Sequence, residues 1–600
     1  MLMKSPEVLT CDLAIIGGGL AGVCAALAAA RNGATVILVQ DRSVLGGNSS
    51  SEVKMHIVGA DCHGHRPGTR ETGIIEELRL EDACRNPQRS FSLWDLLLYE
   101  KVTENPNIRL LLDSHCDGCT TEKQGARVRI LEAHVRRHAT EEEFILRARF
   151  FADCSGDGRL GFEAGADYRM GREAKAEYGE SLAQDQADSY TLGNSILFTA
   201  RRYETPQPFL TPAWARPFRR EDFKHRPFHG FDYGYWWAEW GGTLDTIRDL
   251  DTIRHELLRI ALGIWGYVKN SGDCPESANW ALEWVGALPG KRESRRFLGD
   301  HVLTQDDCQS GRLFEDQVAY GGWWLDLHPP EGVDAPDEMP CVQHHLDQLF
   351  TIPLRALYSR NVENLFFAGR NMSATHVAFA STRVMATCAV MGQAIGTAAA
   401  LLRSTSRNEA IRDLATSQAV HQIQQTLLRD GAFLPGLQND EPNDLARTAQ
   451  IRASSEKEHR TASHVITGPD RSIQSKWGAW AVTADHCWES RELPASLDLT
   501  LSKPVAVKEI HLTFCSGLHR ELILSPSAFT SAKTLRGAQP EVVRDYVIRL
   551  DGKVAVTVQG NYLRKRVHHL PQPLMAQTVQ IEVLATNGHP TARIFEVRLY

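Results

Sequence analysis

Along the first forty residues, the apolar positions change from a strand pattern to a helix pattern and back. The run DLAIIG (residues 12–17) ends in the glycine turn GGLAG, an alanine-rich stretch VCAALAAARNG follows, and ATVILVQ (residues 34–40) closes the unit. This order predicts a βαβ unit with two parallel strands. Apolar runs at residues 145–154 and 364–369 also end in glycine turns, and we expect them to join the same sheet.

Three further patterns follow. Residues 166–354 combine many Trp, Tyr, His and Arg side chains with weak periodicity, as expected of an inserted substrate-binding region. A helix of small residues follows Ala374 and ends near Arg403. A polar helical stretch from Asn408 to Leu428 then leads into a Gly, Pro, Asn and Asp cluster, which is typical of a connection between domains.

Beyond residue 444, short alternating apolar runs separated by turn residues predict a β-sandwich of the jelly-roll type. The expected fold class is therefore α/β: a Rossmann-like dinucleotide-binding domain with an inserted α+β substrate domain, plus a C-terminal β-sandwich. The expected division is 1–165 and 355–405 for the Rossmann-like domain, 166–354 for the inserted substrate or cap region, 406–443 for a helical linker and 444–600 for the sandwich.

Composition and charge narrow the class of protein. A chain of 600 residues exceeds what one hydrophobic core organises, and 42% hydrophobic with 23% charged residues fits a globular enzyme. A net charge of -8 without a long basic stripe argues against nucleic acid as a partner. Because no apolar leader and no roughly 18-residue apolar window is present, we expect a soluble, cytoplasmic protein without a membrane partner.

Thirteen scattered cysteines, an odd number, favour reduced thiols over a disulfide framework. Only Cys116 and Cys119 have a suggestive spacing. Since no second cysteine pair accompanies them, we expect no metal site.

The glycine turn has the pattern G-x-G-x-x-G, at the junction of a predicted strand and helix. There the backbone turns tightly and directs amide groups at a pyrophosphate, so a dinucleotide site is expected. The second strand ends in Gln40, where such sites usually carry an acidic residue that binds ribose. The expected contacts in this unit are Gly17, Gly19, Leu20, Ala21, Gly22, Gln40, Asp41 and Arg42.

The segments LGGNSSSE (residues 45–52), FFADCSGDG (150–158) and NLFFAGRN (364–371) resemble FAD-dependent oxidoreductases related to fumarate reductase and succinate dehydrogenase flavoproteins. The resemblance implies FAD as the cofactor and a helix N-terminus, after the third segment, that faces the flavin pyrimidine. It also implies cofactor contacts at Gly46, Gly47, Asn48, Ser49, Ser50, Asp153, Gly156, Asp157, Gly369 and Arg370.

RETGIIEE (residues 70–77), GKRESRR (290–296) and GRNMSATHVAFASTRVMATC resemble a subgroup of FAD-dependent oxidoreductases often found with sugar-utilisation enzymes. The segment DLARTAQIRASSE, which opens the tail, resembles discoidin or carbohydrate-binding jelly rolls. These resemblances imply a small carbohydrate-like substrate, and they leave open a homo-oligomer and any binding of glycans by the tail.

Flavin chemistry needs a group that moves a proton while a hydride passes, and four residues are candidates. His376 and Arg383 flank the helix expected to face the flavin; the alternative is a buried loop histidine and an arginine that pairs with a flavin carbonyl. His328 can be oriented by Asp326, or it is a capped loop residue. His56 follows the flavin loop, where some related flavoproteins attach the flavin covalently.

An aromatic cluster and a basic segment each have two interpretations, one functional and one purely structural. The faces of aromatic rings bind sugars, but clusters of Trp residues more often belong to a hydrophobic core. Both interpretations are open for Tyr233, Tyr235, Trp236, Trp237, Trp240, Trp323 and Trp324. The cations of residues 291–296 form either an anion clamp or, as we favour, salt bridges around Glu293.

Three hypotheses follow. The leading one is an FAD-dependent dehydrogenase or oxidase that acts on a hydroxyl of a sugar, polyol or glycoside, with a histidine base. The second is a fumarate-reductase-like enzyme that reduces an activated C=C bond and clamps a carboxylate with Arg383 or Arg295. The third is a carbohydrate-binding protein with a structural flavin, against which the intact glycine motif argues.

Overall fold

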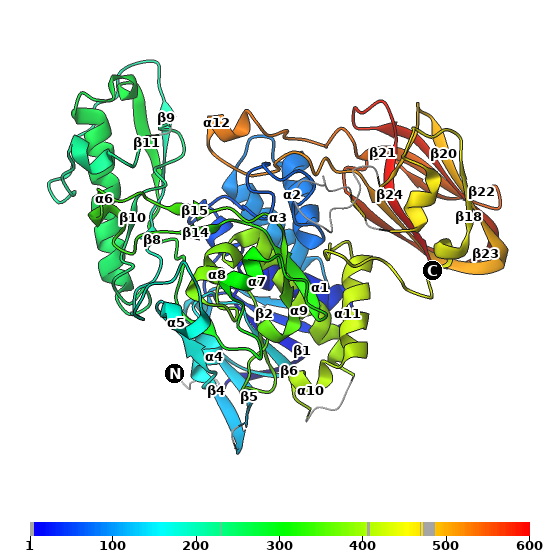
Figure 1. Cartoon of the computed structure of the whole chain (residues 1–600), viewed down its shortest axis with the longest axis horizontal. Coiled ribbons are helices and arrows are strands. Elements are labelled where there is room, and N and C mark those ends of the chain that lie inside the picture. The colour runs from blue at the N-terminus through cyan, green and yellow to red at the C-terminus, as the bar shows by residue number, and fades with distance from the viewer. Residues whose placement is uncertain (1–4, 126, 229, 405–408, 469, 472–485) are drawn as a thin grey trace.

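The structure is a computed structural model that describes residues 5–125, 127–228, 230–404, 409–468, 470–471 and 486–600. Its centre is a seven-stranded sheet in the order β3-β2-β1-β6-β5-β4, with β17 also paired to β6 (Figure 1). The strands are β1 (Glu7–Ile16), β2 (Val36–Val39), β3 (Ile108–Leu111), β4 (Ser114–Gln124), β5 (Arg127–Arg137), β6 (Glu142–Asp153) and β17 (Leu365–Phe367).

Parallel pairing brings the ends of three distant strands together. In the register, Ile16 of β1 and Phe367 of β17 both lie opposite Asp153 of β6. The turns that follow these strands therefore meet at one edge of the sheet, where ligands bind in open α/β sheets. The expected βαβ unit is present, and both later apolar runs join its sheet as predicted.

The hairpin of β4 and β5 and the strand β3 were not predicted from the sequence. The β4 segment SHCDGCTTEKQ is almost entirely polar, so it lacks the apolar alternation that marks a half-buried strand. It forms because β5 offers a complementary antiparallel edge over most of its length.

Helices cover the sheet and share its main hydrophobic core: α1 (Leu20–Arg31), α2 (Ile74–Arg85), α3 (Phe91–Thr103), α9 (Met385–Leu402) and α11 (Ser417–Arg429). α9 lies directly on α1, since a Cβ atom at Gly392 would overlap the carbonyl of Ala21. By length and composition α9 could cross a membrane, but 89% of it is buried inside the protein.

The helix of small residues expected after Ala374 is in fact two helices, α8 (His376–Thr382) and α9. They are separated at Arg383 and Val384, where the extended backbone of Val384 begins α9 anew. Sequence periodicity did not reveal this break, because apolar residues continue through it. The break gives α9 a free N-terminus at Met385.

Between residues 166 and 354, the described residues form short strand pairs, one long helix and two short helices. The chain leaves the central sheet after β6 and returns to it at β17. The larger part of this region, which includes α6 and is seen around that helix in Figure 1, has its own apolar core. The elements of this region, with the preceding α4, are α4 (Arg159–Glu163), β7 (Tyr168–Arg169), α5 (Lys175–Tyr178), β8 (Asn194–Ser195), β9 (Phe198–Arg202), β10 (Glu239–Trp240), α6 (Leu250–Asn270), β11 (Trp280–Val285), β12 (Arg296–Phe297), α7 (Gln305–Gln309), β13 (Gln317–Gly321), β14 (Leu325–Leu327), β15 (Val342–His344) and β16 (Phe350–Pro353).

The segment expected to be a linker packs into the core. α10 (Ile411–Leu414) and α11 follow α9, and Val420, Ile423 and Leu427 of α11 belong to the main hydrophobic cluster. The first residues of the expected stretch, 405–408, lie outside the described residues. The division of the chain at 165, 354, 405 and 443 remains a prediction.

The C-terminal strands form a second seven-stranded sheet that folds into a β-sandwich around its own core. Two separate apolar runs of the sequence, at residues 496–501 and 505–514, lie in one strand, β20, whose register shifts between Thr500 and Val505. The first half of the long β23 was missed because Pro571 and Pro573 interrupt its pattern; both lie where pairing is interrupted between His569 and Leu574. The strands are β18 (Gln450–Ala453), β19 (Trp488–Glu489), β20 (Ala495–Phe514), β21 (Val543–Leu550), β22 (Lys553–Val558), β23 (Lys565–Thr586) and β24 (Arg593–Leu599).

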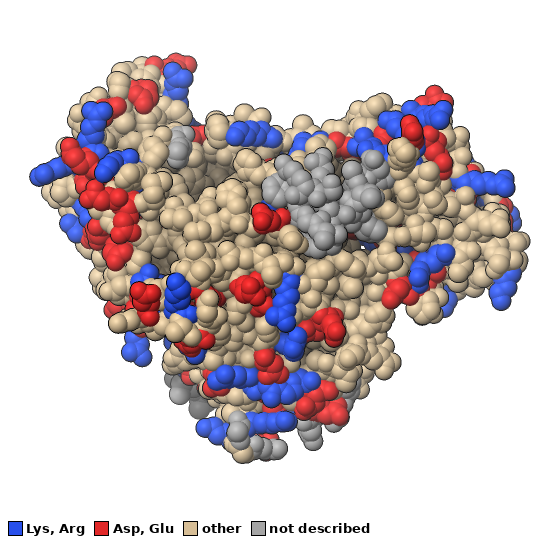
Figure 2. Space-filling view, in the orientation of Figure 1, with Lys and Arg blue, Asp and Glu red and all other residues tan. Residues whose placement is uncertain are grey.

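On the face shown in Figure 2, acidic and basic side chains are interspersed over the central part and the cap. All thirteen cysteines are free thiols, as expected from their odd number.

Candidate active site

A cavity of about 430 Å³ lies at the edge of the sheet where β1, β6 and β17 end; we call it the large cavity. The glycine turn forms its floor. A Cβ atom at Gly17 would overlap the carbonyl of Cys154, and one at Gly22 would overlap the carbonyl of Gly17. A Cβ atom at Gly19, by contrast, would meet no protein atom within 4 Å, although Gly19 lines the cavity. The turn is thus shaped for an external group that approaches the Gly19 backbone, as a pyrophosphate does.

At one end of the large cavity, Gln40 is committed to the protein. Its Oε1 accepts the Gly18 N–H at 2.7 Å, and its Nε2 donates to the carbonyl of Val44 at 3.1 Å. Gln40 therefore fixes the glycine turn, and the neighbouring Asp41, which is exposed and lines the cavity, is the carboxylate available to a ribose.

Four of the expected cofactor residues do not line the large cavity. Ser49 is buried and donates to the carbonyl of Gly46, while Ser50 is buried beside it and Gly22 packs on Gly17. Asp153 is fully buried and accepts hydrogen bonds from the backbone N–H groups of Ser155 and Gly161 and from other neighbours. These residues shape the loops rather than touch the cavity.

The remaining expected contacts do line it: Gly17, Gly19, Leu20, Ala21, Gln40, Asp41, Arg42, Gly46, Gly47, Asn48, Gly156, Asp157, Gly369 and Arg370. Sequence reasoning missed several others, among them Glu52, Ser114, His115, Arg159, Lys291, Arg295, Met385 and Cys388. The basic segment of residues 291–296 was the available signal for two of these.

The other end of the large cavity is rich in cations. Asp157 pairs with Lys291 at 2.5 Å and with Arg370 at 3.5 Å. Burial favours the neutral acid, but the two cations outweigh it and lower the pKa of Asp157. Met385 opens α9 here without a side-chain cap, and the backbone N–H of Ala386 donates to the carbonyl of Val58 at 3.1 Å. The positive end of the helix dipole therefore faces this end. This arrangement suits negative charge on a reduced flavin.

A second cavity, of about 70 Å³, adjoins this cationic end; we call it the small cavity. The two cavities share Asn48, Lys291, Arg370, Arg383 and Met385. The remaining wall combines apolar and polar side chains: Val53, Met55, His56, Val58, Ser195, Leu197, Gly290, Arg292 and Val384.

His56 is the histidine that lines the small cavity. Its ring packs edge-on against Trp236 at 4.9 Å and stacks on Tyr233 at 6.2 Å. Nε2 lies 2.7 Å from Oγ of Ser525, and Nδ1 has no partner among the described residues. Burial, and to a smaller extent the neighbouring His63, lowers the pKa of His56 to about 3, so the ring is neutral at physiological pH.

His328 lies behind the small cavity between two carboxylates. Nδ1 is 3.0 Å from Glu239 and Nε2 is 3.1 Å from Asp326. Burial opposes the charged form, but the two carboxylates outweigh it and raise the pKa of His328. An imidazolium that donates to both partners has no free nitrogen, so this geometry does not equip His328 to take a proton from a substrate.

Arg383 extends from the break between the two helices to both cavities. Its Nη2 donates to Asp326 at 2.9 Å, while its buried Nε has no partner among the described residues. A buried N–H without an acceptor fits one supplied by a cofactor or substrate. Arg292, which lines the small cavity but not the large one, donates to Oγ of Ser195 at 2.8 Å and pairs with Glu239.

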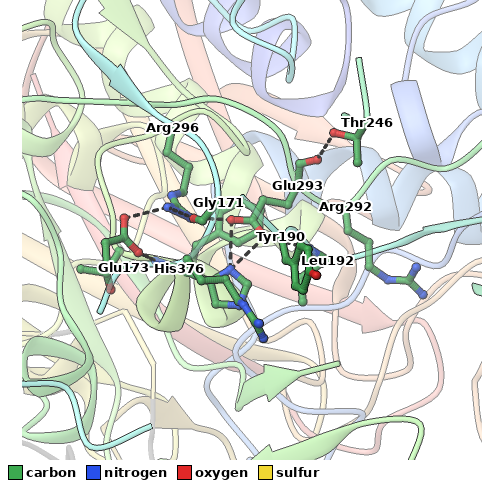
Figure 3. A network of polar contacts seen from close by, with 12 residues as sticks. Gly171, Glu173, Tyr190, Leu192, Thr246, Arg292, Glu293, Arg296 and His376 are labelled. Carbon is green, nitrogen blue, oxygen red and sulfur yellow. Dashed lines mark hydrogen bonds and ion pairs between the residues drawn. The ribbon is translucent and has the colours of Figure 1, made fainter. Parts of the chain in front are cut away.

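His376 belongs to a neighbouring buried network (Figure 3). Its Nδ1 lies 2.9 Å from Glu293, which also pairs with Arg296, and Arg296 pairs in turn with Glu173 at 2.7 Å. His376 lines neither cavity. Its place in this network matches the alternative interpretation of a buried histidine.

The structure places the aromatic cluster and the basic segment, for which the sequence allowed two interpretations each. Trp237 and Trp240 pack on the apolar core of the cap, and none of the seven aromatic residues of that cluster lines either cavity. The segment at 291–296 is divided: Glu293 and Arg296 form the expected buried salt bridge, whereas the cations at 291, 292 and 295 reach the cavities.

The parallel strands of the central sheet, the glycine turn and the cationic end of the large cavity together define a dinucleotide-binding flavoprotein. Residues 12–427 match the family described as FAD dependent oxidoreductase, and the chain belongs to this family. It is an FAD-dependent oxidoreductase with FAD as its cofactor. No curated protein matches the sequence.

Some solved structures are similar to about a quarter of the chain. The family 32 carbohydrate-binding module of Streptococcus pneumoniae EndoD is 19% identical and covers 26% of this chain and 99% of that chain, with a TM-score of 0.20. The family 32 module of C. perfringens NanJ, in complex with galactose, is 19% identical over 26% of this chain and 96% of that chain, with a TM-score of 0.18. The lectin domain of lectinolysin, complexed with Lewis B antigen, is 15% identical over 27% and 97%, with a TM-score of 0.19.

Proposed function

We propose that this flavoenzyme oxidises a hydroxyl group of a sugar, polyol or glycoside in the small cavity, with His56 as the proton acceptor. The observation that carries the proposal is a buried histidine that lines the cavity adjoining the cationic end of the large one and whose Nδ1 has no partner among the described residues. A general base must be unprotonated and within reach of the proton that it takes.

The residues of the small cavity have separate tasks. When bound, FAD would supply the two-electron acceptor for the oxidation of a substrate hydroxyl to a carbonyl. Nδ1 of His56 takes the hydroxyl proton. Arg292 and Arg383 stabilise the partial negative charge on the substrate oxygen while that proton departs. The side chains of Asn48 and Ser195 can hydrogen-bond neighbouring hydroxyls of the substrate.

The same cations favour a second candidate function. Arg292 and Arg383 line one small cavity, and two guanidinium groups are well suited to a carboxylate. A fumarate-reductase-like enzyme would use them to bind an unsaturated carboxylate while the C=C bond is reduced. We rank this second because both arginines already pair with buried carboxylates, Glu239 and Asp326, which reduce the positive charge left for a substrate.

The FAD-loaded enzyme distinguishes the two. Under anaerobic conditions it is mixed with D-galactose, D-glucose, myo-inositol and methyl β-D-galactoside, and flavin bleaching is followed. We expect bleaching by at least one compound, and a His56→Gln variant that keeps its flavin spectrum but is reduced about 10²- to 10⁴-fold more slowly. His345→Gln is the matched control, because His345 packs on Trp324 outside both cavities. If none of the four bleaches the flavin and fumarate reoxidises the dithionite-reduced enzyme, the reductase function replaces this one.

A further inference from the structure

The β-sandwich sends a long connection out of its own fold. Residues 515–542, which we call the arm, join the end of β20 to the start of β21. In Figure 1 the arm runs from the sandwich across the top of the central part towards the cap, where its short helix α12 (Ala528–Ser531) lies near β9 and β11. The arm therefore spans the three parts of the molecule.

The near half of the arm is fixed to the cofactor-binding part by buried ionic contacts. Arg70 pairs with Glu76 at 2.7 Å and also donates to the backbone carbonyl of Arg520. The hydroxyl of Ser516 donates to the same Glu76 at 2.6 Å. Arg70 and Glu76 are each 1% exposed, so this contact is fully enclosed and holds the arm tightly.

The far half of the arm is fixed as well. Arg89 donates to the hydroxyl of Ser531 and to the backbone carbonyl of Ser527. The backbone N–H of Ala528 donates to Asp232 of the cap. Both ends of the segment around α12 are thus held by residues outside the sandwich.

Between these anchors, Ser525 contacts His56, which lines the small cavity. Its hydroxyl oxygen lies 2.7 Å from Nε2 of His56, and it also accepts the backbone N–H of Ser527 at 3.1 Å. Ser525 is 1% exposed and His56 is 4% exposed. No other hydrogen bond reaches the imidazole from the described residues, so Ser525 alone sets its polar environment on this side.

We propose that Ser525 is a positioning residue that fixes the tautomer of His56, and hence that the β-sandwich completes the active site. This inference rests on the proposed function, in which Nδ1 takes a proton and so must carry a lone pair. A neutral imidazole with a bare Nδ1 carries its hydrogen on Nε2. The oxygen of Ser525 has two lone pairs: one receives the Ser527 N–H and the other receives Nε2–H of His56.

The same contact serves the charged form. When Nδ1 gains the proton, the imidazolium keeps Nε2–H, and its hydrogen bond to Ser525 strengthens because the donor is now charged. Loss of the hydroxyl removes an acceptor that is needed both before and after proton transfer. We expect its loss to lower activity about 10- to 100-fold, as does the loss of the partner that orients a metal-bound histidine.

The first test reads the tautomer without any substrate. The FAD-loaded full chain is labelled with 15N-histidine, and the ring nitrogens of His56 are assigned by comparison with His56→Gln. We expect Nε2 to be protonated and Nδ1 to be bare, and Ser525→Ala to convert His56 to a mixture of tautomers. A hydrogen on Nδ1 in the parent protein, or an unchanged spectrum in Ser525→Ala, would overturn the inference.

The second test measures anaerobic flavin reduction by the member of the four-compound panel that bleaches the parent fastest. We expect Ser525→Ala to lower the limiting reduction rate about 10- to 100-fold with little change in the half-saturating concentration, and Ser525→Thr to restore most of the rate. Ser527→Ala is the matched control: it removes the hydroxyl that caps α12, two residues away, and leaves the contact with His56 intact. Equal slowing in Ser527→Ala would mean that a loosened arm explains the effect, and would overturn the inference.

The double variant separates this inference from the function on which it rests. If Ser525 acts through His56, adding Ser525→Ala to His56→Gln slows reduction no further. If His56→Gln reduces as fast as the parent, the proposed base is wrong, whatever the 15N spectrum shows. If His56→Gln is slow but Ser525→Ala is as fast as the parent, the base stands and the positioning role of Ser525 is wrong.

Discussion

Arg383 donates a hydrogen bond of 2.9 Å to Asp326, so an arginine that lines both cavities is held in place by a buried carboxylate. The same carboxylate oxygen lies 3.1 Å from Nε2 of His328. Asp326 therefore compensates two cations at once. Burial opposes its ionisation, but the charges of His328 and Arg383 outweigh that effect and lower the pKa of Asp326.

The first prediction concerns this carboxylate. Asp326→Asn keeps the shape but leaves two buried cations without their shared partner, and we expect the free energy of unfolding to fall by about 3 to 5 kcal/mol. Denaturant titration of the FAD-loaded protein measures it. Asp316→Asn is the control, because its partner Arg355, at 3.0 Å, is 48% exposed and such a pair contributes about 1 kcal/mol or less. Equal losses in both variants would contradict the special role of Asp326.

The second prediction concerns the glycine turn. Gly19→Leu meets no protein atom near its Cβ but projects into the large cavity, so we expect a folded protein that retains little FAD. Gly22→Leu overlaps the Gly17 carbonyl, and we expect it to destabilise the domain itself. Flavin absorbance per protein and thermal unfolding followed by circular dichroism measure the two effects. Stoichiometric FAD in Gly19→Leu would show that the pyrophosphate does not approach there.

The third prediction concerns acid stability. Burial lowers the pKa of His56 to about 3 and that of His568 to about 4, whereas both titrate near 6.5 in the unfolded chain. Below about pH 6.5, both histidines therefore bind protons in the unfolded chain while they remain neutral in the folded protein. Their contribution to stability is present above about pH 6.5 and declines as the pH falls towards the folded values, by about 1.4 kcal/mol per pH unit for each histidine.

Chemical denaturation between about pH 6.5 and about pH 4 tests this slope. We expect His568→Gln to flatten it by one histidine's share, while His459→Gln leaves it unchanged, because the side chain of His459 is 77% exposed. A slope that is the same in His568→Gln and the parent would contradict the assignment of His568 as a buried neutral group.

The fourth prediction compares two histidines. His376→Ala leaves the fully buried Glu293 without its imidazole partner, so we expect a loss of stability but flavin reduction within a few-fold of the parent. His56→Gln should behave in the opposite way. Stopped-flow reduction and thermal melting of both variants check this. A His376→Ala protein of unchanged stability whose reduction is slowed about 100-fold or more would make His376 the base instead.

The fifth prediction concerns the tail expressed alone, from residue 444 to residue 600. We expect a folded sandwich, because its strands enclose their own core. The anchors of the arm at Arg70, Arg89 and Asp232 are absent from this fragment. Trypsin should therefore cut the arm at Arg520, Lys533 or Arg536 in the fragment and spare it in the full chain. Equal protection in both would show that the arm holds its shape without those anchors.

Much of the fold could be predicted because each of its main elements has a recognisable pattern of apolar residues within its own short segment. The βαβ unit shows its strand and helix periods in sequence, and the later strands at β6 and β17 are apolar runs that end in glycine turns. The hairpin of β4 and β5 could not be predicted in this way. Its partner strand β5 follows directly in the chain, but the polar residues of β4 lack the apolar alternation by which a half-buried strand is recognised.

The cofactor site was predicted best where the backbone itself is the ligand. Gly17 and Gly22 are required by the close approach of neighbouring backbone, and Gly19 leaves open space at the cavity; the pattern of glycines states these requirements directly. Contacts made by side chains were predicted less well, because the sequence does not show whether a side chain points into the cavity or into the protein. Ser49 and Asp153 lie in the expected loops but are turned into the protein, whereas Lys291, far along the chain, faces the cavity.

The sequence by itself determined the cofactor class, because a dinucleotide is bound through a local turn whose spacing one short segment contains. Only the tertiary structure decided which histidine meets the small cavity and what surrounds it. His328, beside an aspartate in sequence, gains a second carboxylate in space, while His56 gains Ser525 from the other end of the chain. Ionisation and hydrogen bonding depend on neighbours within a few ångströms, and those neighbours come from any part of a folded chain.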